Sequence, residues 1–193
     1  MRVFLAGATG AIGSRLVPLL VAEGHQVAGM TRSAAKAGVL RAQGAQPVVC
    51  DVFDAEALGD AVVAFGAEVV VHQLTDLPDD AARIVELSAA NARIRRDGTR
   101  NLLAAARAAG TGRFVAQSVA WKVPGDGGLA VEDLERMVLQ ADGVVVRYGQ
   151  FYGPGTYFEH EPPGPPRVHV DEAARRTLPA LSAASTTLTI VED

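Results

Sequence analysis

Short runs of apolar residues alternate along this chain with longer segments in which apolar residues recur every three or four positions. Short runs bounded by turn residues predict β-strands, and the longer spacing predicts amphipathic helices. We expect strands at residues 2–6, 26–30, 46–49, 68–72, 113–118, 143–147 and 186–191. The fourth strand contains three consecutive valines, a pattern that suits a strand buried on both faces.

Helices are expected over residues 11–23, 33–43, 54–64, 131–141 and 171–181, with Ser33 and Asp54 as N-caps. A long helical region over residues 80–109 is interrupted near Gly98. The proline-rich segment 150–168 is expected to be a surface loop, because proline is excluded from helix interiors and central strands. Strand and helix in alternation predict an α/β protein: a doubly wound parallel sheet with helices on both faces. At 193 residues, the chain is expected to form a single domain over 1–193.

The composition excludes several classes of function. Hydrophobic residues make up 49% of the chain, and the formal net charge is −4, which argues against a nucleic-acid surface. No apolar stretch reaches the roughly 18 residues needed to cross a bilayer. Gly7 and Gly10 interrupt the apolar start of the chain, so no signal peptide is expected. The single cysteine, Cys50, fits a reducing compartment. We therefore expect a cytoplasmic protein with no membrane or nucleic-acid partner.

The strongest motif is a glycine-rich turn between the first strand and the first helix, Gly7-Ala8-Thr9-Gly10-Ala11-Ile12-Gly13. Gly7 can make the tight turn, Gly10 lets a pyrophosphate approach the backbone, and Gly13 lets the helix pack against the strand. The free N–H groups and the dipole of the helix start favour the anion. This context predicts a dinucleotide site rather than a glycine-rich turn without a ligand.

The spacing of this turn, G-x-x-G-x-x-G, resembles that of the extended and atypical short-chain dehydrogenase/reductases, an NAD(P)-dependent epimerase/dehydratase-like family. Further stretches that resemble the family follow in order over nearly the whole chain: Cys50-Asp51-Val52, Gly98-Thr99-Arg100-Asn101-Leu102-Leu103, Arg113-Phe114-Val115-Ala116-Gln117-Ser118, Arg147-Tyr148-Gly149-Gln150-Phe151-Tyr152-Gly153-Pro154-Gly155 and Val168-His169-Val170-Asp171-Glu172-Ala173-Ala174. The resemblance implies a Rossmann-type fold. The short segment between Gly155 and His169 implies a small or reduced C-terminal substrate region.

The end of the second strand indicates which nicotinamide cofactor is bound. NAD enzymes usually carry an acidic residue there, which accepts the ribose hydroxyls. This chain instead has Thr31-Arg32-Ser33, and a guanidinium pairs bidentately with a 2′-phosphate. We therefore expect NADP(H) as the cofactor, although a solvated surface arginine is the alternative for Arg32. The expected cofactor-binding residues are Gly7, Thr9, Gly10, Ala11, Ile12, Gly13, Thr31, Arg32, Ser33, Asp51, Val52, Gln73 and Tyr148.

The family's catalytic groups are incomplete in this sequence. The resemblance implies a substrate-orienting serine at the end of the fifth strand, which Ser118 matches. It also implies a Tyr-x-x-x-Lys pair, in which the lysine lowers the pKa of a proton-donating tyrosine, and this pair is absent. We expect Tyr152 to be the proton donor and Lys122 to be a second candidate. A packing tyrosine and a solvated loop lysine are the respective alternatives.

Two classes of function therefore stay open. One is an NADP(H)-dependent oxidoreductase or epimerase-like enzyme acting on an unidentified small molecule. The other is a non-catalytic NADP-binding sensor or partner protein. Aromatic residues such as Trp121 favour an apolar or aromatic ligand. Glu159-His160-Glu161 lies among prolines and suits a solvated loop, so no metal is expected. Family resemblance further implies a homodimer formed by helices near residues 81–109 and 131–141.

Overall fold

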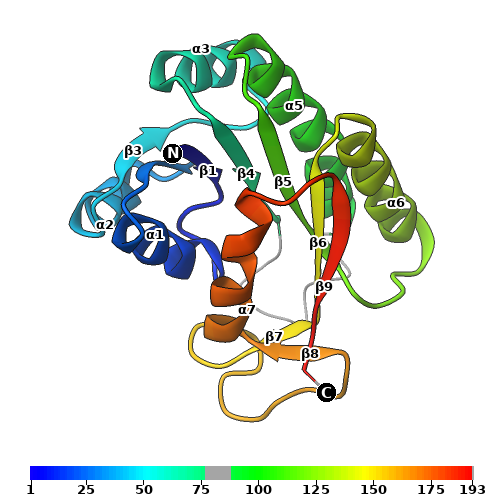
Figure 1. Ribbon diagram of the computed structural model, residues 1–193. Coiled ribbons are helices and arrows are strands. Elements are labelled where there is room, and N and C mark those ends of the chain that lie inside the picture. The colour runs from blue at the N-terminus through cyan, green and yellow to red at the C-terminus, as the bar shows by residue number, and fades with distance from the viewer. Residues whose placement is uncertain (77–87, 193) are drawn as a thin grey trace.

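The computed structural model describes residues 1–76 and 88–192. Its main sheet has seven parallel strands in the order β3-β2-β1-β4-β5-β6-β9 (Figure 1). The strands are β1 (Arg2–Ala6), β2 (Gln26–Thr31), β3 (Gln46–Val49), β4 (Val69–His72), β5 (Arg113–Val119), β6 (Val144–Tyr148) and β9 (Thr186–Ile190). β1 pairs with both β2 and β4, so the strand order reverses there. The predicted doubly wound parallel sheet is confirmed.

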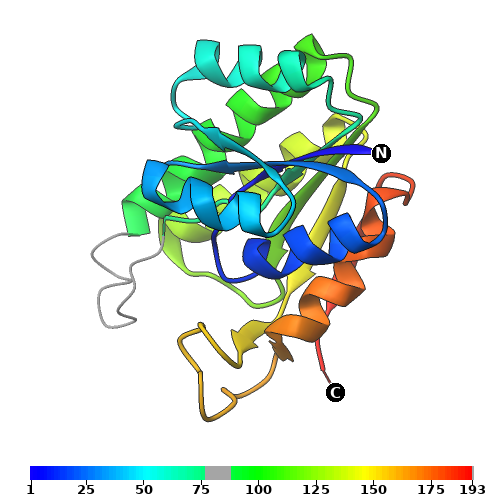
Figure 2. The same ribbon diagram turned by 90° about the vertical axis from the view of Figure 1, so that its left-hand side faces the viewer.

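Helices cover both faces of this sheet (Figures 1 and 2). One face packs against α1 (Gly13–Ala22), α2 (Ala37–Ala42) and α7 (Val170–Thr177). The other packs against α3 (Ala55–Phe65), α5 (Thr99–Ala108) and α6 (Gly125–Gln140). Strand side chains alternate between the two cores: Val3 and Leu5 belong to the first, and Phe4 and Ala6 to the second. Burial on both faces explains why β4 begins with three consecutive valines.

The segment predicted as a loop over residues 150–168 contains strands at both ends, which corrects that prediction. β7 (Gln150–Tyr152) and β8 (Arg167–His169) form a small parallel sheet, with their connecting loop, below the main sheet (Figure 2). Phe151 packs against Tyr148, with ring centroids 5.2 Å apart. Strands of three residues are too short for an alternation pattern to be recognised. The prolines of this segment all lie in the loop between the two strands.

Two helix starts differ from the predicted ones. At Ser33, a predicted N-cap, no capping bond is made, and a 3₁₀ turn, Ala34–Lys36, follows it. Asp54, by contrast, caps α3 as predicted, because its side chain accepts a hydrogen bond from the Ala57 N–H at 3.1 Å. α6 begins six residues before the predicted start at residue 131. Its first turns contain glycine where a side chain would not fit: a Cβ at Gly128 would lie 2.1 Å from the Val123 carbonyl oxygen. Close packing, not poor helix propensity, accounts for that residue.

The helical region predicted over 80–109 lies partly outside the described residues, which resume at residue 88. From there α4 (Ser88–Arg93), a π-helical turn (Ile94–Gly98) and α5 follow one another without a non-helical residue between them. The irregularity expected near Gly98 is this π-helical turn, which ends at Gly98. Two side chains attach this helix to the end of β4. The Asn91 Oδ1 accepts from the Asp76 N–H at 3.2 Å, and Thr99 Oγ1 lies 3.1 Å from His72 Nε2. None of the described helices is long and apolar enough to cross a membrane.

Candidate functional site

The glycine turn lies where β1 meets its two neighbours, and the protein itself requires two of its glycines. Gly7 has a φ of +86°, and a Cβ there would lie 2.6 Å from the Gln73 carbonyl oxygen. A Cβ at Gly13 would lie 2.1 Å from the Gly7 carbonyl oxygen, so only glycine lets α1 approach β1 this closely.

Gly10 differs, because no neighbouring protein atom excludes a side chain there. The heavy atom nearest to a Cβ at Gly10 would be the Gly7 carbonyl oxygen at 3.4 Å, an ordinary contact distance, and Gly10 is not among the glycines with positive φ. No side chain caps the start of α1 at Ile12. Open space above Gly10 and uncapped N–H groups fit the pyrophosphate of a dinucleotide.

The ends of β1, β2 and β4 converge beside this turn. Thr9 and Thr31 are joined through their hydroxyl groups, 3.2 Å apart, and Thr31 Oγ1 also accepts from the Ser33 N–H. The Arg32 guanidinium donates to Asp76 Oδ1 at 2.9 Å, across the gap between the ends of β2 and β4. The structure therefore brings together the residues that were predicted to recognise a 2′-phosphate. It adds Asp76, which a sequence pattern could not pair with Arg32.

Asp51 and Val52, both expected to bind the cofactor, follow β3 and differ in their exposure. Asp51 is exposed, and its carboxylate accepts from the Phe53 N–H at 2.9 Å. Val52 is buried in the core, and its carbonyl accepts from Asn101 Nδ2 at 2.9 Å. Val52 therefore belongs to the core, while Asp51 remains accessible.

Gln73 and Tyr148 lie behind the cofactor edge rather than on it. Both are buried, and Gln73 Nε2 donates to the Tyr148 hydroxyl at 3.2 Å. That hydroxyl lies 2.7 Å from Thr177 Oγ1, which in turn donates to the Ala173 carbonyl. Burial raises the pKa of Tyr148 to about 12. The cofactor-binding role of Gln73 and Tyr148 stays a prediction; Gln73 Oε1 is buried without a hydrogen-bond partner among the described residues.

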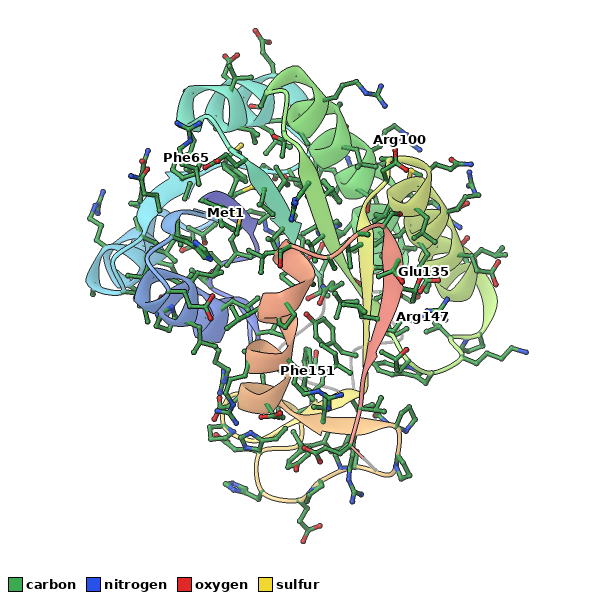
Figure 3. All side chains as sticks on the ribbon, in the orientation of Figure 1. Met1, Phe65, Arg100, Glu135, Arg147 and Phe151 are labelled. Atoms are coloured by element: carbon green, nitrogen blue, oxygen red, sulfur yellow. The ribbon has the colours of Figure 1, made fainter. Side chains whose placement is uncertain are left out.

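Ser118 is held in a charged cluster between β5, β6 and α6. Its hydroxyl donates to Glu135 Oε1 at 2.6 Å, and the Arg147 Nε donates to the same oxygen at 2.8 Å. A second bond joins Arg147 Nη2 to the other oxygen of Glu135, and Figure 3 shows these two side chains beside each other. Burial acts to raise the pKa of Glu135, but the hydrogen bonds from Arg147 and Ser118 outweigh it and hold the pKa below its ordinary value.

The other two predicted catalytic residues have separate surroundings. The Tyr152 hydroxyl donates to Glu192 Oε2 at 2.8 Å, and the Tyr152 ring makes an edge contact with His169. The bond to Glu192 raises the pKa of Tyr152. Lys122 is exposed on the loop after β5. Ser118 and Tyr152 share no hydrogen-bond partner among the described residues, so their joint role in catalysis stays a prediction.

Arg15 is a site residue that the sequence analysis missed. It lies in the first turn of α1, where Nη1 donates to the Ala11 carbonyl at 2.7 Å. Its Nε donates to Asp171 Oδ1 at 2.6 Å, and Nη2 donates to the Pro154 carbonyl. One guanidinium thus ties the glycine turn to α7 and to the loop after β7. The family-like segment beginning at Val168 contained Asp171 but gave no indication of its partner.

Parallel strands, a glycine turn at the topological switch point and an open helix N-terminus define a dinucleotide-binding α/β protein. The family model described as NAD(P)H-binding matches residues 7–142, so the chain belongs to this NAD(P)H-binding family. The predicted similarity to short-chain dehydrogenase/reductases of the epimerase/dehydratase type is also confirmed.

Curated relatives include two reductases. A 3-diazoavenalumate denitrifying reductase from Streptomyces sp. is 42% identical over 188 residues, covering 83% of this chain and 60% of that protein. A 4-hydroxy-2-methyl-3-oxo-4-farnesyl-3,4-dihydroquinoline-1-oxide ketoreductase from Stigmatella aurantiaca is 34% identical over 118 residues, covering 60% of this chain and 32% of that protein. The chain therefore spans less than two thirds of either relative.

Solved structures share the fold at lower identity. The UDP-glucose 4-epimerase of Thermotoga maritima superposes with a TM-score of 0.81 at 19% identity, covering 99% of this chain and 77% of that one. The Thermus thermophilus UDP-glucose 4-epimerase, solved with NAD, gives a TM-score of 0.80 at 22% identity, covering 99% and 78%. Identity this low supports the shared fold alone.

Gly10→Val should abolish binding of NADPH while leaving the protein folded. The added side chain occupies the space left for the pyrophosphate but meets no protein atom closely. Gly13→Val is the matched comparison, because its side chain collides with the Gly7 carbonyl and should lower the melting temperature as well. Calorimetric titration and thermal unfolding test both variants. Unchanged NADPH affinity in a folded Gly10→Val protein would remove the glycine turn from the cofactor site.

Glu135→Gln should destabilise the fold in a pH-dependent way. Because the folded-state pKa of Glu135 lies below its ordinary value, its charge stabilises the protein above the unfolded pKa of about 4.3, and this contribution is lost as the pH falls further. We expect a loss of about 1–2 kcal/mol near neutral pH, since Arg147 keeps contact with water. Urea unfolding of the wild type and of Glu135→Gln, from neutral pH to below the unfolded pKa of the carboxyl group, measures the difference in their free energies of unfolding. A constant difference at all pH values would contradict the assignment.

Proposed function

We propose that this chain is an NADP(H)-dependent reductase of a small aromatic molecule. The observation that carries the choice of cofactor is the Arg32 guanidinium just after β2, paired with Asp76 and next in sequence to Thr31, which bonds to Thr9 of the glycine turn. A cation at this position favours the 2′-phosphate of NADP(H) over the bare ribose of NAD(H). When bound, the reduced nicotinamide supplies a hydride, and the chain supplies its position.

The relatives support reduction as the direction of the reaction. Both curated relatives quoted above are named as reductases, and the first is named for a diazo compound. We extend that substrate class to this chain and propose an aromatic diazonium group as the hydride acceptor. Hydride adds to the terminal nitrogen to give an aryl diazene. The diazene loses N₂ when its carbon–nitrogen bond breaks and its N–H proton passes to the ring carbon, so the products are the arene and N₂.

This reaction suits a site without a Tyr-x-x-x-Lys pair. Reduction of a carbonyl group generates an alkoxide that must receive a proton, which is the task of the tyrosine. Reduction of a diazonium cation by one hydride forms no alkoxide, and its atoms and charges balance without an added proton. The proton on Tyr152 is already directed to Glu192, and that of Ser118 to Glu135. The same engagement of both groups would also suit the alternative, a non-catalytic NADP-binding sensor.

Arg32→Ala should weaken NADPH binding by about 1.5–3 kcal/mol, because a charge-assisted bond to the phosphate is lost, while NADH binding changes little. Asp76→Asn should act in the opposite direction. It releases Arg32 from its ion pair and removes a negative charge beside the phosphate. Calorimetric titration of both variants with both cofactors tests the pair. Equal losses for NADPH and NADH in Arg32→Ala would show that Arg32 does not recognise the phosphate.

The proposed acceptor predicts a substrate preference. Absorbance of NADPH should fall in the presence of an arenediazonium salt but not of an aromatic aldehyde, and Gly10→Val protein corrects for the uncatalysed reaction. Tyr152→Phe should retain this activity. A loss of about 100-fold in Tyr152→Phe would instead make Tyr152 a proton donor. No consumption with either compound, in a protein that binds NADPH, would favour the sensor.

The predicted homodimer stays a prediction. Part of its expected interface lies outside the described residues, and the outer face of α6 exposes Leu129 and Leu139.

A further inference from the structure

Arg95 lies in the π-helical turn, on the side of the helix that faces the end of β4. Asn91, four residues before it, accepts from the backbone of Asp76, and Thr99, four residues after it, contacts His72. Residues four apart lie on one face of a helix, so Arg95 projects between these two contacts. It therefore faces the segment from His72 to Asp76, at the carboxyl end of β4.

The positive charge of Arg95 acts on His72, which is buried at the end of β4. The His72 Nδ1 accepts from the Leu74 N–H at 3.2 Å, so the proton of a neutral ring is on Nε2, directed at Thr99. Burial and, secondarily, the positive charge of Arg95 lower the pKa of His72 to about 4. His72 is therefore neutral near pH 7 and adds no charge of its own to the site.

Arg95 has no counter-ion among the residues that the structure describes. Burial lowers the pKa of its guanidinium, and no hydrogen bond or ion pair to it is found in the described part of the chain. Two other described arginines without such partners, Arg41 and Arg107, are exposed to water, whereas Arg95 is partly shielded. The remaining described arginines all have acidic or carbonyl partners: Arg2, Arg15, Arg32, Arg93, Arg96, Arg100, Arg113, Arg136, Arg147, Arg167, Arg175 and Arg176.

A shielded guanidinium that has no partner in the described part of the chain, at the edge of a site, favours a ligand that supplies the opposite charge. Its planar donors match a carboxylate or a phosphate. The phosphates of the cofactor already have partners elsewhere: the glycine turn for the pyrophosphate and Arg32 for the 2′-phosphate. Arg95 belongs to the other helical layer, beside His72 and the end of β4, where a parallel sheet binds the reacting end of its ligands.

We propose that Arg95 binds the carboxylate of the substrate, so that the small molecule reduced by this protein is an aromatic acid. This inference rests on the proposed function, because it places the substrate beside the nicotinamide. It makes Arg95 a specificity-determining residue: the ion pair orients the acid and leaves the opposite end of the molecule toward the cofactor.

Calorimetric titration of the NADPH-loaded protein with cinnamate and with cinnamamide tests the charge directly, because these probes share their shape. The wild type should bind cinnamate roughly 10-fold or more tightly than cinnamamide, the effect of one charge-assisted bond. Arg95→Gln should remove this preference, Arg95→Lys should restore part of it, and cinnamamide affinity should not change. Arg107→Gln is the matched control, since it removes an exposed, unpaired arginine of the same helix.

Thermal unfolding separates a binding role from a structural one. Arg95→Gln should be as stable as the wild type or melt about 2–4 °C higher, since the charge removed has no partner among residues 1–76 and 88–192. A clearly lower melting temperature would make Arg95 a structural residue and overturn the proposal. So would an absence of charge preference in the wild type, or a parallel loss of NADPH affinity in Arg95→Gln, which would assign the anion to the cofactor.

The two proposals fail in different ways. If the wild type binds NADPH but prefers neither probe, only the assignment of Arg95 fails. If the wild type does not bind NADPH, the proposed function fails, and the same two titrations of the cofactor-free protein still decide whether Arg95 binds a carboxylate.

Discussion

The close approach of α1 to β1 is the constraint on which the rest of this structure depends. The Gly7 carbonyl lies where a Cβ at Gly13 would be, and the Gln73 backbone lies where a Cβ at Gly7 would be. Three segments, the turn after β1, the start of α1 and the end of β4, are therefore packed backbone against backbone. Because β1 pairs with β2 on one side and with β4 on the other, this packing lies at the topological switch point, where open parallel sheets form the crevice that binds their ligands.

Charged side chains then connect the elements around that crevice. Arg15 links α1 to α7 and to the loop after β7, Arg32 links the end of β2 to the end of β4 through Asp76, and Arg147 links β6 to α6 through Glu135. Arg95, by contrast, lacks a partner among the described residues. The Arg32–Asp76 pair is exposed and contributes little to stability, about 0–1 kcal/mol, so it matters more for placing the ends of β2 and β4 than for folding. An ion pair that includes Arg32 can also be exchanged for a bond to a ligand.

The sequence was sufficient for the main sheet and for the glycine turn because both depend on local signals. The consecutive valines of β4 predict a buried strand, and the glycines around Gly10 predict a turn, each from a few neighbouring residues of the chain. The small sheet of β7 and β8 was missed because each strand has three residues, and the early start of α6 was missed because Gly128 is explained only by the Val123 carbonyl against it. The partners of Arg32 and Ser118 are 44 and 17 residues away, and no pattern along the chain shows such pairs.

The missing proton donor and the unpaired Arg95 of the described chain are consistent with one chemical requirement. A site that reduces a carbonyl must hold an acid close to the developing oxyanion. In this chain the hydroxyl groups of Ser118 and Tyr152 instead donate to the carboxylates of Glu135 and Glu192. A site that transfers hydride to a cationic acceptor needs only a fixed distance between acceptor and nicotinamide, which binding at a remote group can provide. A guanidinium that holds a carboxylate at the far end of an aromatic acid supplies that kind of orientation. The cation of the protein then lies away from the cation of the substrate, so the two positive charges do not oppose each other in the crevice.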